Sequence, residues 1–358
     1  MSNNKPIRVL HLLKNFDIGG VETSNIKLGN YLVDKVEFWG IAGIKGLYLN
    51  ADIIEKKISV FPNLKNFYNP FNWFFNFLFL FRLIKSKKIN ILHYHFRIHL
   101  PYIYLIKIIF HKIKIIYTHH STFKDKLVNF IYADYFVAIS DYQYQNLGKN
   151  VFFKSNASII TNGVFLNNSL HKINRPLSNL GYVGRFDKPK GLDFLIHCFN
   201  ENSETLKPFK LIIRGKGELD DKIKKIIDNI KNIIMDGPKI SITEIYKDIG
   251  ILIVPSSVKT NAVETFPNIV MLEAMSLYIP VICPNNIKLS DKFVNNYNLI
   301  TYESDNSKDL VTKLIYLNSN PSYVQKITNN AYNTIVKYFS FERFGDRVFA
   351  IYNKVLNP

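Results

Sequence analysis

Apolar runs typical of strands alternate with helical stretches along most of the chain. The first run, IRVLHLL at 7–13, predicts a buried strand, and a pair of glycines then leads into a helix expected at 19–33. The runs that predict further strands in this half are VEFWGIAG, INILHYH, KIIYTHH, YFVAIS and ASIITNG. Because a strand, a glycine turn and a helix open a nucleotide-binding layer, this half predicts a Rossmann-like domain with a mostly parallel sheet.

The alternation stops at 165–179, where a polar stretch without a period predicts a linker. It restarts with the strand-like runs NLGYVGRF, FKLIIRGKG, NIIMDG, ILIVPSS and PVICPN, and with helices expected at LDFLIHCFN and LDDKIKKIIDNI. Apolar residues at helical spacing predict a packing helix at the end of the chain, namely Phe344, Val348, Ile351, Tyr352 and Val355. We therefore expect an α/β protein of two Rossmann-like domains, the first made of 1–168 and 340–358 and the second of 177–339.

The composition is that of a folded protein with an excess of basic residues. Of the 358 residues, 47% are hydrophobic and 21% are charged, which excludes a disordered chain and a single small binding module. The 46 lysines and arginines exceed the 28 acidic residues, and the net charge of +18 suits a polyanion such as nucleic acid, anionic lipid or an acidic polymer. The many Lys, Asn and Ile residues are also typical of an AT-rich genome, which would give a basic surface without any partner.

Two features of the sequence predict a cytoplasmic protein. Cys198 and Cys283 each stand alone in apolar surroundings, so we expect buried thiols in a reducing compartment. The apolar run near the N-terminus has only about seven residues, which is too short for a signal peptide or a membrane-spanning helix.

The strongest chemical signal lies in the second half of the chain. In GRFDKPKG, Arg185 and Lys190 flank the end of a predicted strand and the start of a helix at Gly191, where backbone N–H groups favour an anion and two cations suit a diphosphate. Downstream, Glu264 precedes a helix that we expect Pro267 to start, and Glu273 lies within that helix. A carboxylate accepts hydrogen bonds from vicinal hydroxyls, so such a pair suits a ribose and a sugar ring. Either motif alone is equally typical of surface charges, but their occurrence together favours a nucleotide-sugar site.

In order along nearly the whole chain, these motifs resemble those of the retaining glycosyltransferases of family 4, which are group 1 glycosyl transferases. The shared motifs are GGVE at 19–22, HYH at 93–95, THH at 118–120, NGV at 162–164, the GR and KG of 184–191, GKG at 215–217 and PS at 255–256. The resemblance implies the GT-B fold, in which two Rossmann-like domains face each other across a cleft. It also implies that the C-terminal helix packs back towards the N-terminal domain.

The resemblance also implies a role for each matched residue. Arg185 and Lys190 would bind the donor diphosphate and stabilise it as it leaves, Glu273 would hold the ribose, and Glu264 would orient the donor sugar. Gly20 would let the backbone approach the phosphates, and His120 would lie beside the reacting carbon. The implied catalytic residues are His120, Glu264, Arg185 and Lys190. The implied donor-binding residues are Gly19, Gly20, Arg185, Lys190, Gly215, Gly237, Thr265, Phe266, Pro267, Asn268 and Glu273. The implied acceptor-side residues are His95, His119 and His120.

The sequence departs from the family pattern around the acidic motif. Eight residues separate Glu264 from Glu273 where the family has seven, and the family's EGF is ETF here. Tyr278 occupies the position of the family's usual glycine before a strand, where a positive φ would strain any other residue. These changes put the contacts to the donor sugar in question, but not the fold.

The implied function is transfer of a hexose from a UDP-sugar to a glycan or lipid-linked acceptor in surface polysaccharide, lipopolysaccharide or glycolipid synthesis. We expect no cofactor and no metal, because the two cations serve the diphosphate and the acidic pair Asp220 and Asp221 lies on a basic helix. One alternative is a sugar-nucleotide epimerase of the same fold. The other is a basic nucleic-acid-binding protein, which is disfavoured because no motif of that class is present, so we expect no nucleic-acid partner.

Two stretches of the N-terminal half combine apolar and basic residues. Residues 67–88 are rich in aromatic side chains and end in lysines, and residues 102–116 place Lys107, Lys112 and Lys114 in an apolar run. Such stretches predict contact with an anionic membrane surface, here the inner face of the membrane, for a peripheral protein. The alternative is a helix and a strand buried in the first domain, with lysines that extend to solvent.

Overall fold

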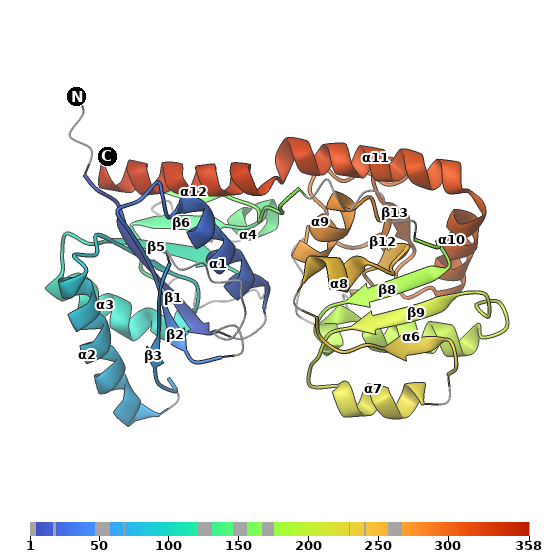
Figure 1. Ribbon diagram of the computed structural model, residues 1–358, viewed down its shortest axis with the longest axis horizontal. Helices are drawn as coiled ribbons and strands as arrows, with labels where there is room; N and C mark the ends of the chain where they lie inside the picture. The colour runs from blue at the N-terminus through green and yellow to red at the C-terminus, as the bar shows by residue number, and fades with distance from the viewer. Residues whose placement is uncertain are drawn as a thin grey trace. The chain divides into compact units, whose positions relative to one another are not determined.

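The computed structural model describes residues 5–16, 19–46, 58–67, 69–120, 131–145, 156–166, 175–228, 230–239, 241–256 and 267–357. The chain divides into two compact units, the first made of Met1–Asn162 and Glu342–Pro358 and the second of Gly163–Phe341 (Figure 1). Each unit has its own parallel sheet and its own buried core.

The sheet of the first unit has the strand order β3-β2-β1-β4-β5-β6-β7, and all of its paired strands are parallel. Its strands are β1 (Arg8–Asn15), β2 (Phe38–Ile44), β3 (Ser59–Leu64), β4 (Ile91–Tyr94), β5 (Lys114–His119), β6 (Tyr135–Ala138) and β7 (Ala157–Ile159). The helices of this unit are α1 (Gly20–Leu32), α2 (Pro70–Ser86), α3 (Leu100–Ile109), α4 (Asp141–Gln145) and α12 (Phe341–Leu356), with a 3-10 turn, η2 (Arg97–His99). The first residue of α12 belongs to the second unit.

Alternation along β1 divides its side chains between the two faces of the sheet. Leu10 and Leu12 join the core that α2 and α3 complete. His11 points to the other face, where its ring contacts Tyr352 of α12. His93 of β4 lies level with His11 in the parallel register, so both imidazoles lie on the same face.

The sheet of the second unit has the strand order β10-β9-β8-β11-β12-β13 and is also parallel. Its strands are β8 (Asn179–Val183), β9 (Lys210–Arg214), β10 (Ile233–Met235), β11 (Ile251–Ile253), β12 (Val281–Pro284) and β13 (Ile300–Tyr302). Its helices are α6 (Leu192–Glu201), α7 (Asp220–Ile227), α8 (Ile242–Tyr246), α9 (Ile269–Ser276), α10 (Ser307–Ser319) and α11 (Pro321–Tyr338), with a 3-10 turn, η5 (Lys188–Lys190). α6, α7 and α10 share one core cluster with this sheet, and α8 and α9 share another. α11 contributes buried residues to both clusters.

The two parallel sheets confirm the expected α/β architecture, and Cys198 and Cys283 are buried free thiols as predicted. Most of the predicted linker, 167–174, lies outside the described residues. β3 and β13 were not predicted, because SVFPNL contains Pro and Asn and ITY is too short to show a period. Among the described residues, no helix has both the length and the apolar content needed to cross a bilayer.

Candidate functional site

The loop from β8 to α6 carries the two predicted phosphate-binding cations. Lys190 is the last residue of η5, and Gly191 follows with a φ of 70° as the N-cap of α6. This left-handed backbone strains any residue with a side chain, which explains the glycine. Arg185 has a side chain that is 73% exposed and forms an ion pair of 3.0 Å with Asp187. An ion pair this exposed is weak, so Arg185 can exchange Asp187 for an anionic ligand.

Lys190 lies in a half-buried position close to Arg185. Burial and the positive charge of Arg185 lower the pKa of Lys190 to about 8, while Asp187 acts in the opposite direction. The two cations therefore repel each other at a helix N-terminus, where backbone dipoles add further positive potential. An anion bound here would relieve that repulsion.

The loops after β8 and β9 lie close enough for their main chains to form a hydrogen bond. Gly184 donates its N–H to the carbonyl of Arg214 at 3.0 Å, and Gly215 donates to the carbonyl of Gly237 at 3.2 Å. A Cβ on Gly215 would lie 1.8 Å from the oxygen of Gly184, so only glycine fits there. The structure thus brings together three segments that were predicted to bind the donor, around Arg185, Gly215 and Gly237.

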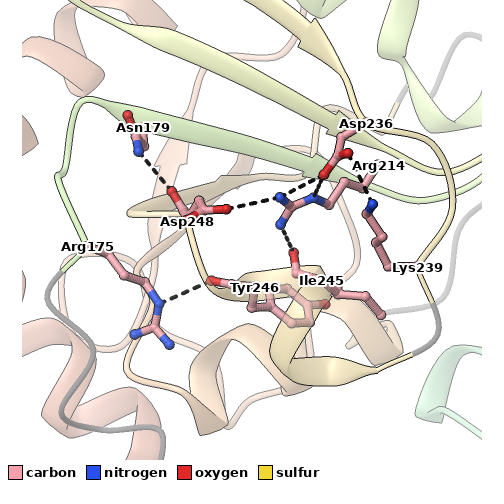
Figure 2. Close-up of polar contacts among 8 residues, drawn as sticks. All are labelled: Arg175, Asn179, Arg214, Asp236, Lys239, Ile245, Tyr246 and Asp248. Atoms are coloured by element: carbon pink, nitrogen blue, oxygen red, sulfur yellow. Dashed lines mark hydrogen bonds and ion pairs between the residues drawn. The ribbon is translucent and has the colours of Figure 1, made fainter.

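Arg214, which the sequence analysis missed, holds these loops in place (Figure 2). Its side chain is only 5% exposed, and it contacts Asp236 at 3.0 Å and Asp248 at 3.3 Å. It also donates to the carbonyl of Ile245 in α8 at 2.7 Å. The only indication of this role in the sequence is that Arg214 is the last residue of the apolar strand KLIIR. Because its guanidinium is already shared among these acceptors, Arg214 is a structural cation rather than a second phosphate ligand.

Tyr182 supports the same loop from the core of the second unit. Its buried hydroxyl donates to the carbonyl of Arg185 at 2.7 Å, which fixes the backbone that carries this cation. The sequence contains no signal for this contact, because Tyr182 looks like an ordinary strand residue.

The helix of the acidic motif, α9, begins differently from the prediction. Asn268 is its N-cap, and its side chain accepts a hydrogen bond from the backbone N–H of Met271 at 3.0 Å. Pro267 precedes this cap and does not occupy the first turn, so the expectation of a helix started by proline is wrong. The side-chain oxygen of Asn268 satisfies a backbone N–H in the first turn, whereas proline has no side-chain oxygen that could accept this hydrogen bond. Glu273 lies within α9 as predicted.

Glu264, Thr265 and Phe266 lie outside the described residues, so the effect of the longer spacing on the contacts to the donor sugar stays an expectation. Tyr278 has a φ of 58°, which is the positive value expected at the position of the family's glycine. Its ring stacks on Tyr332 of α11, with ring centroids 4.3 Å apart. This stacking offsets part of the backbone strain.

The predicted glycine turn opens α1 in the first unit. Gly19 is the N-cap of α1, and Gly20 is the first residue of the helix. A Cβ on Gly19 would lie 2.3 Å from a carboxylate oxygen of Glu22, so a side chain at this position would displace Glu22.

The acceptor-side histidines lie at the carboxyl ends of β4 and β5 in the same unit, where His119 is the last residue of β5 and His95 and His120 directly follow β4 and β5. His95 Nδ1 lies 3.0 Å from His120 Nε2, so the structure brings these two rings together. Burial lowers the pKa of His120 to about 3, with the nearby His119 as a smaller cause. Burial and the charge of Arg97 lower the pKa of His119 to about 4, and its Nδ1 lies 3.3 Å from the hydroxyl of Tyr117. All three rings are therefore neutral at pH 7, since burial also lowers the pKa of His95.

Both halves of the chain match models of known protein families. Residues 171–334 match the model for glycosyl transferases group 1, and residues 18–168 match the model for glycosyltransferase family 4. An uncharacterized glycosyltransferase of Methanocaldococcus jannaschii is 29% identical over 216 residues, which are 59% of this chain and 57% of that protein. The capsular polysaccharide biosynthesis glycosyltransferase CapM of Staphylococcus aureus is 25% identical over 195 residues, which are 53% of this chain and 50% of CapM.

The fold is also shared with solved structures. The crystal structure of Anabaena HepE in complex with UDP-glucose matches with a TM-score of 0.78 at 15% identity, covering 96% of this chain and 98% of HepE. The chain spans about half the length of the curated relatives it matches, and the likeness to HepE concerns the fold alone. The two family models and the two parallel sheets agree, and the chain belongs to the family 4 type of glycosyltransferases with the GT-B fold.

Proposed function

We propose that this protein is a retaining, metal-independent glycosyltransferase that moves a hexose from a UDP-sugar to a glycan or lipid-linked acceptor. The observation that carries the proposal is the proximity of Arg185 and Lys190 before the start of α6. The two positive charges repel each other there, and the charge of Arg185 helps to lower the pKa of Lys190. The name of CapM supports an acceptor in surface polysaccharide synthesis, and lipopolysaccharide or glycolipid synthesis uses the same class of acceptor. The UDP-glucose bound by HepE supports a UDP-sugar as donor.

The chemistry of sugar transfer accounts for these residue types. As the bond to the diphosphate breaks, positive charge develops at the anomeric carbon and negative charge on the departing phosphate. Arg185 and Lys190 stabilise that negative charge, and the backbone at Gly20 leaves room for the phosphates. Glu273 accepts hydrogen bonds from the ribose hydroxyls, and Glu264 orients the donor sugar. The role proposed for His120 is on the acceptor side, beside the reacting carbon. Its lowered pKa makes it neutral at pH 7 in the free protein.

The donor assignment is tested by a screen of purified protein against UDP-, GDP- and ADP-sugars, with binding, hydrolysis and sugar isomerisation each measured. We expect binding and slow hydrolysis of one UDP-sugar, with activity that persists in excess EDTA. Activity that needs added Mg²⁺ or Mn²⁺ would overturn metal independence. Isomerisation of the sugar without any acceptor would favour an epimerase instead.

The first unit exposes apolar side chains that support peripheral binding to the inner face of the membrane. Phe71 on α2 is 82% exposed and Ile108 on α3 is 76% exposed. Other exposed apolar residues of the same two helices are Phe74, Phe75 and Leu105. α2 and α3 are neighbours, because the rings of Phe81 and Phe110 lie 5.3 Å apart. The alternative accounts for part of both stretches, because α2 and α3 each bury one side in the core of the first unit and residues 114–116 belong to the buried strand β5. The exposed apolar side chains on the other side of the two helices support the membrane proposal.

Basic residues accompany this apolar surface, which suits an anionic lipid headgroup. Lys65 Nζ lies 4.7 Å from the centre of the Phe75 ring, and Lys85 and Lys112 are exposed at the ends of the two helices. Lys107 is different, because it forms an ion pair of 3.0 Å with Asp134. We therefore expect Lys107 to contribute to the stability of the first unit rather than to lipid binding.

Vesicle co-sedimentation tests this proposal. Wild-type protein should bind vesicles that contain anionic phosphatidylglycerol more strongly than neutral phosphatidylcholine vesicles, and the preference should weaken in 1 M salt. The double variant Phe71→Ser, Ile108→Ser should lose most binding, whereas Ile315→Ser, at an exposed residue of α10, should not. Equal binding to both vesicle types at low salt would contradict the proposal, and tight binding to DNA with a steep salt dependence would favour the nucleic-acid alternative.

A further inference from the structure

A row of buried histidines runs through the first unit on the face of the sheet that α12 covers. His11, His93 and His95 are at most 4% exposed, and Tyr352 of α12 is fully buried between two of them. The Tyr352 hydroxyl lies 2.9 Å from His11 Nε2 and 2.9 Å from His93 Nδ1. One phenol therefore joins β1 to β4 through hydrogen bonds.

The row continues in both directions from Tyr352. On one side, His11 Nδ1 lies 2.9 Å from His95 Nε2, and His95 Nδ1 lies 3.0 Å from His120 Nε2. On the other side, His93 Nε2 lies 2.7 Å from the hydroxyl of Thr118. We call these residues the imidazole row; its members in order are His120, His95, His11, Tyr352, His93 and Thr118. Each ring nitrogen of the three central histidines has one partner within the row.

Burial keeps the imidazoles of the row neutral. It lowers the pKa of His11 to about 3, against a smaller effect of a hydrogen bond to Asn25, and it lowers the pKa values of His93 and His95 as well. A neutral imidazole has one N–H and one lone pair, on opposite nitrogens. If one ring of the row donates through Nδ1, its Nε2 must accept, and the next ring is constrained in the same way.

The row consequently has two proton arrangements. When Thr118 donates to His93, the protons point towards His120, whose Nε2 accepts and whose Nδ1 carries the hydrogen. When Thr118 accepts, every proton is reversed, and His120 carries its hydrogen on Nε2. The tautomer of His120 is thus coupled to a threonine hydroxyl through four intervening side chains.

The three central histidines also lie close enough to suggest a metal site, since a ligand atom from each lies within 4.8 Å of the others. An ion there would have to separate His11 Nδ1 from His95 Nε2, which are hydrogen-bonded to each other. The arrangement fits a continuous hydrogen-bonded row better than a set of metal ligands.

We propose that one of these two arrangements is the more stable and that the whole imidazole row adopts it, so that His120 has a single neutral tautomer. Its Nδ1 then has a fixed donor or acceptor character towards the acceptor substrate. His95, His11, Tyr352, His93 and Thr118 are positioning residues. Stacking keeps the rings aligned, with the centroids of His93 and His95 4.5 Å apart and those of His11 and Trp39 4.4 Å apart. The role in transfer rests on the proposed function, but the fixed tautomer of His120 does not.

The experiment removes the link in the middle of the row. Tyr352→Phe deletes the hydroxyl that joins His11 to His93 and preserves the ring. The matched control is Tyr94→Phe, which loses a buried hydroxyl bonded to the carbonyl of Tyr132 at 2.8 Å, within the core on the other face of the same sheet. The ¹⁵N NMR shifts of the imidazole nitrogens distinguish the two tautomers directly.

We expect the wild type and Tyr94→Phe to show His120 in one tautomer from pH 5 to 8, and Tyr352→Phe to show a mixture. Transfer by Tyr352→Phe should have a kcat lower by on the order of tenfold, with an unchanged KM for the donor. If Tyr352→Phe does not fold, Thr118→Val opens the end of the row and should give the same mixture. A single, unchanged His120 tautomer in the folded variants would overturn the proposal, even if the donor screen confirms the transferase.

Discussion

The hydroxyl of Tyr246 donates to Glu273 Oε2 at 3.1 Å and so joins α8 to α9. The same hydroxyl lies 3.2 Å from the carbonyl of Val270, one turn earlier in α9. Tyr246 is fully buried, and burial together with the charge of Glu273 raises its pKa well above the usual value. The phenol therefore stays protonated and holds one carboxylate oxygen of Glu273 in place.

This contact leads to a prediction about nucleotide binding. Tyr246→Phe should weaken UDP binding by about fivefold, because one hydrogen bond to a charged group contributes roughly 1 kcal/mol or more. Glu273→Gln should weaken the binding of UDP even without the sugar, whereas Glu264→Gln should weaken only that of the UDP-sugar. Isothermal titration with UDP and with the UDP-sugar measures both. Equal losses of UDP affinity in the two glutamine variants would contradict the division of roles.

The two cations of the β8–α6 loop lead to a prediction about catalysis. Arg185→Ala and Lys190→Ala should each lower kcat/KM by about 100-fold, which corresponds to roughly 3 kcal/mol of lost stabilisation of the leaving group. Lys188→Ala is the control, because Lys188 lies in the same turn with an exposed side chain. Circular dichroism should show an intact fold in all three variants. Full activity in both Arg185→Ala and Lys190→Ala would refute the assignment of the phosphate site.

The lowered pKa of Lys190 gives a prediction about pH. With a pKa of about 8, Lys190 is charged below that pH and loses its charge above it, so the affinity of the free enzyme for UDP should fall as pH rises from 7 to 9. Lys190→Arg keeps a positive charge over this range. The affinity of this variant should therefore be nearly independent of pH between 7 and 9. The same decline with pH in both proteins would show that another group titrates.

The buried contacts of Arg214 predict a loss of stability without a change in chemistry at the site. Arg214→Leu removes the guanidinium that lies between Asp236 and Asp248, and it should lower the free energy of unfolding by about 2 kcal/mol. Urea unfolding measures this change. Lys239→Leu removes a partly exposed partner of Asp236 and should cost well under 1 kcal/mol. A loss of similar size in both variants would contradict the central role of Arg214.

Local sequence patterns determined a large part of this description. The strands around the motifs were predictable because a buried parallel strand needs an unbroken apolar run, as in LIIR at 211–214 or ILIV at 251–254. The positive φ of Tyr278 was expected because the resemblance places the family's glycine at this position. The buried state of Cys198 and Cys283 followed from their apolar surroundings.

Other contacts depend on parts of the chain that are far apart in the sequence. The hydroxyl of Tyr352 reaches His11 only because α12 packs on the strand that opens the chain, 341 residues earlier. Tyr352 was predicted only as a packing residue of a terminal helix. The helical spacing of the apolar residues gives no information about the histidines that its hydroxyl contacts. Likewise, the partners of Arg214 are set by the order of the parallel strands, which places β10 beside β9. Side-chain periodicity shows which face of a helix or strand is buried. Which residue that face contacts depends on strand order and helix packing, and only the tertiary structure decides these.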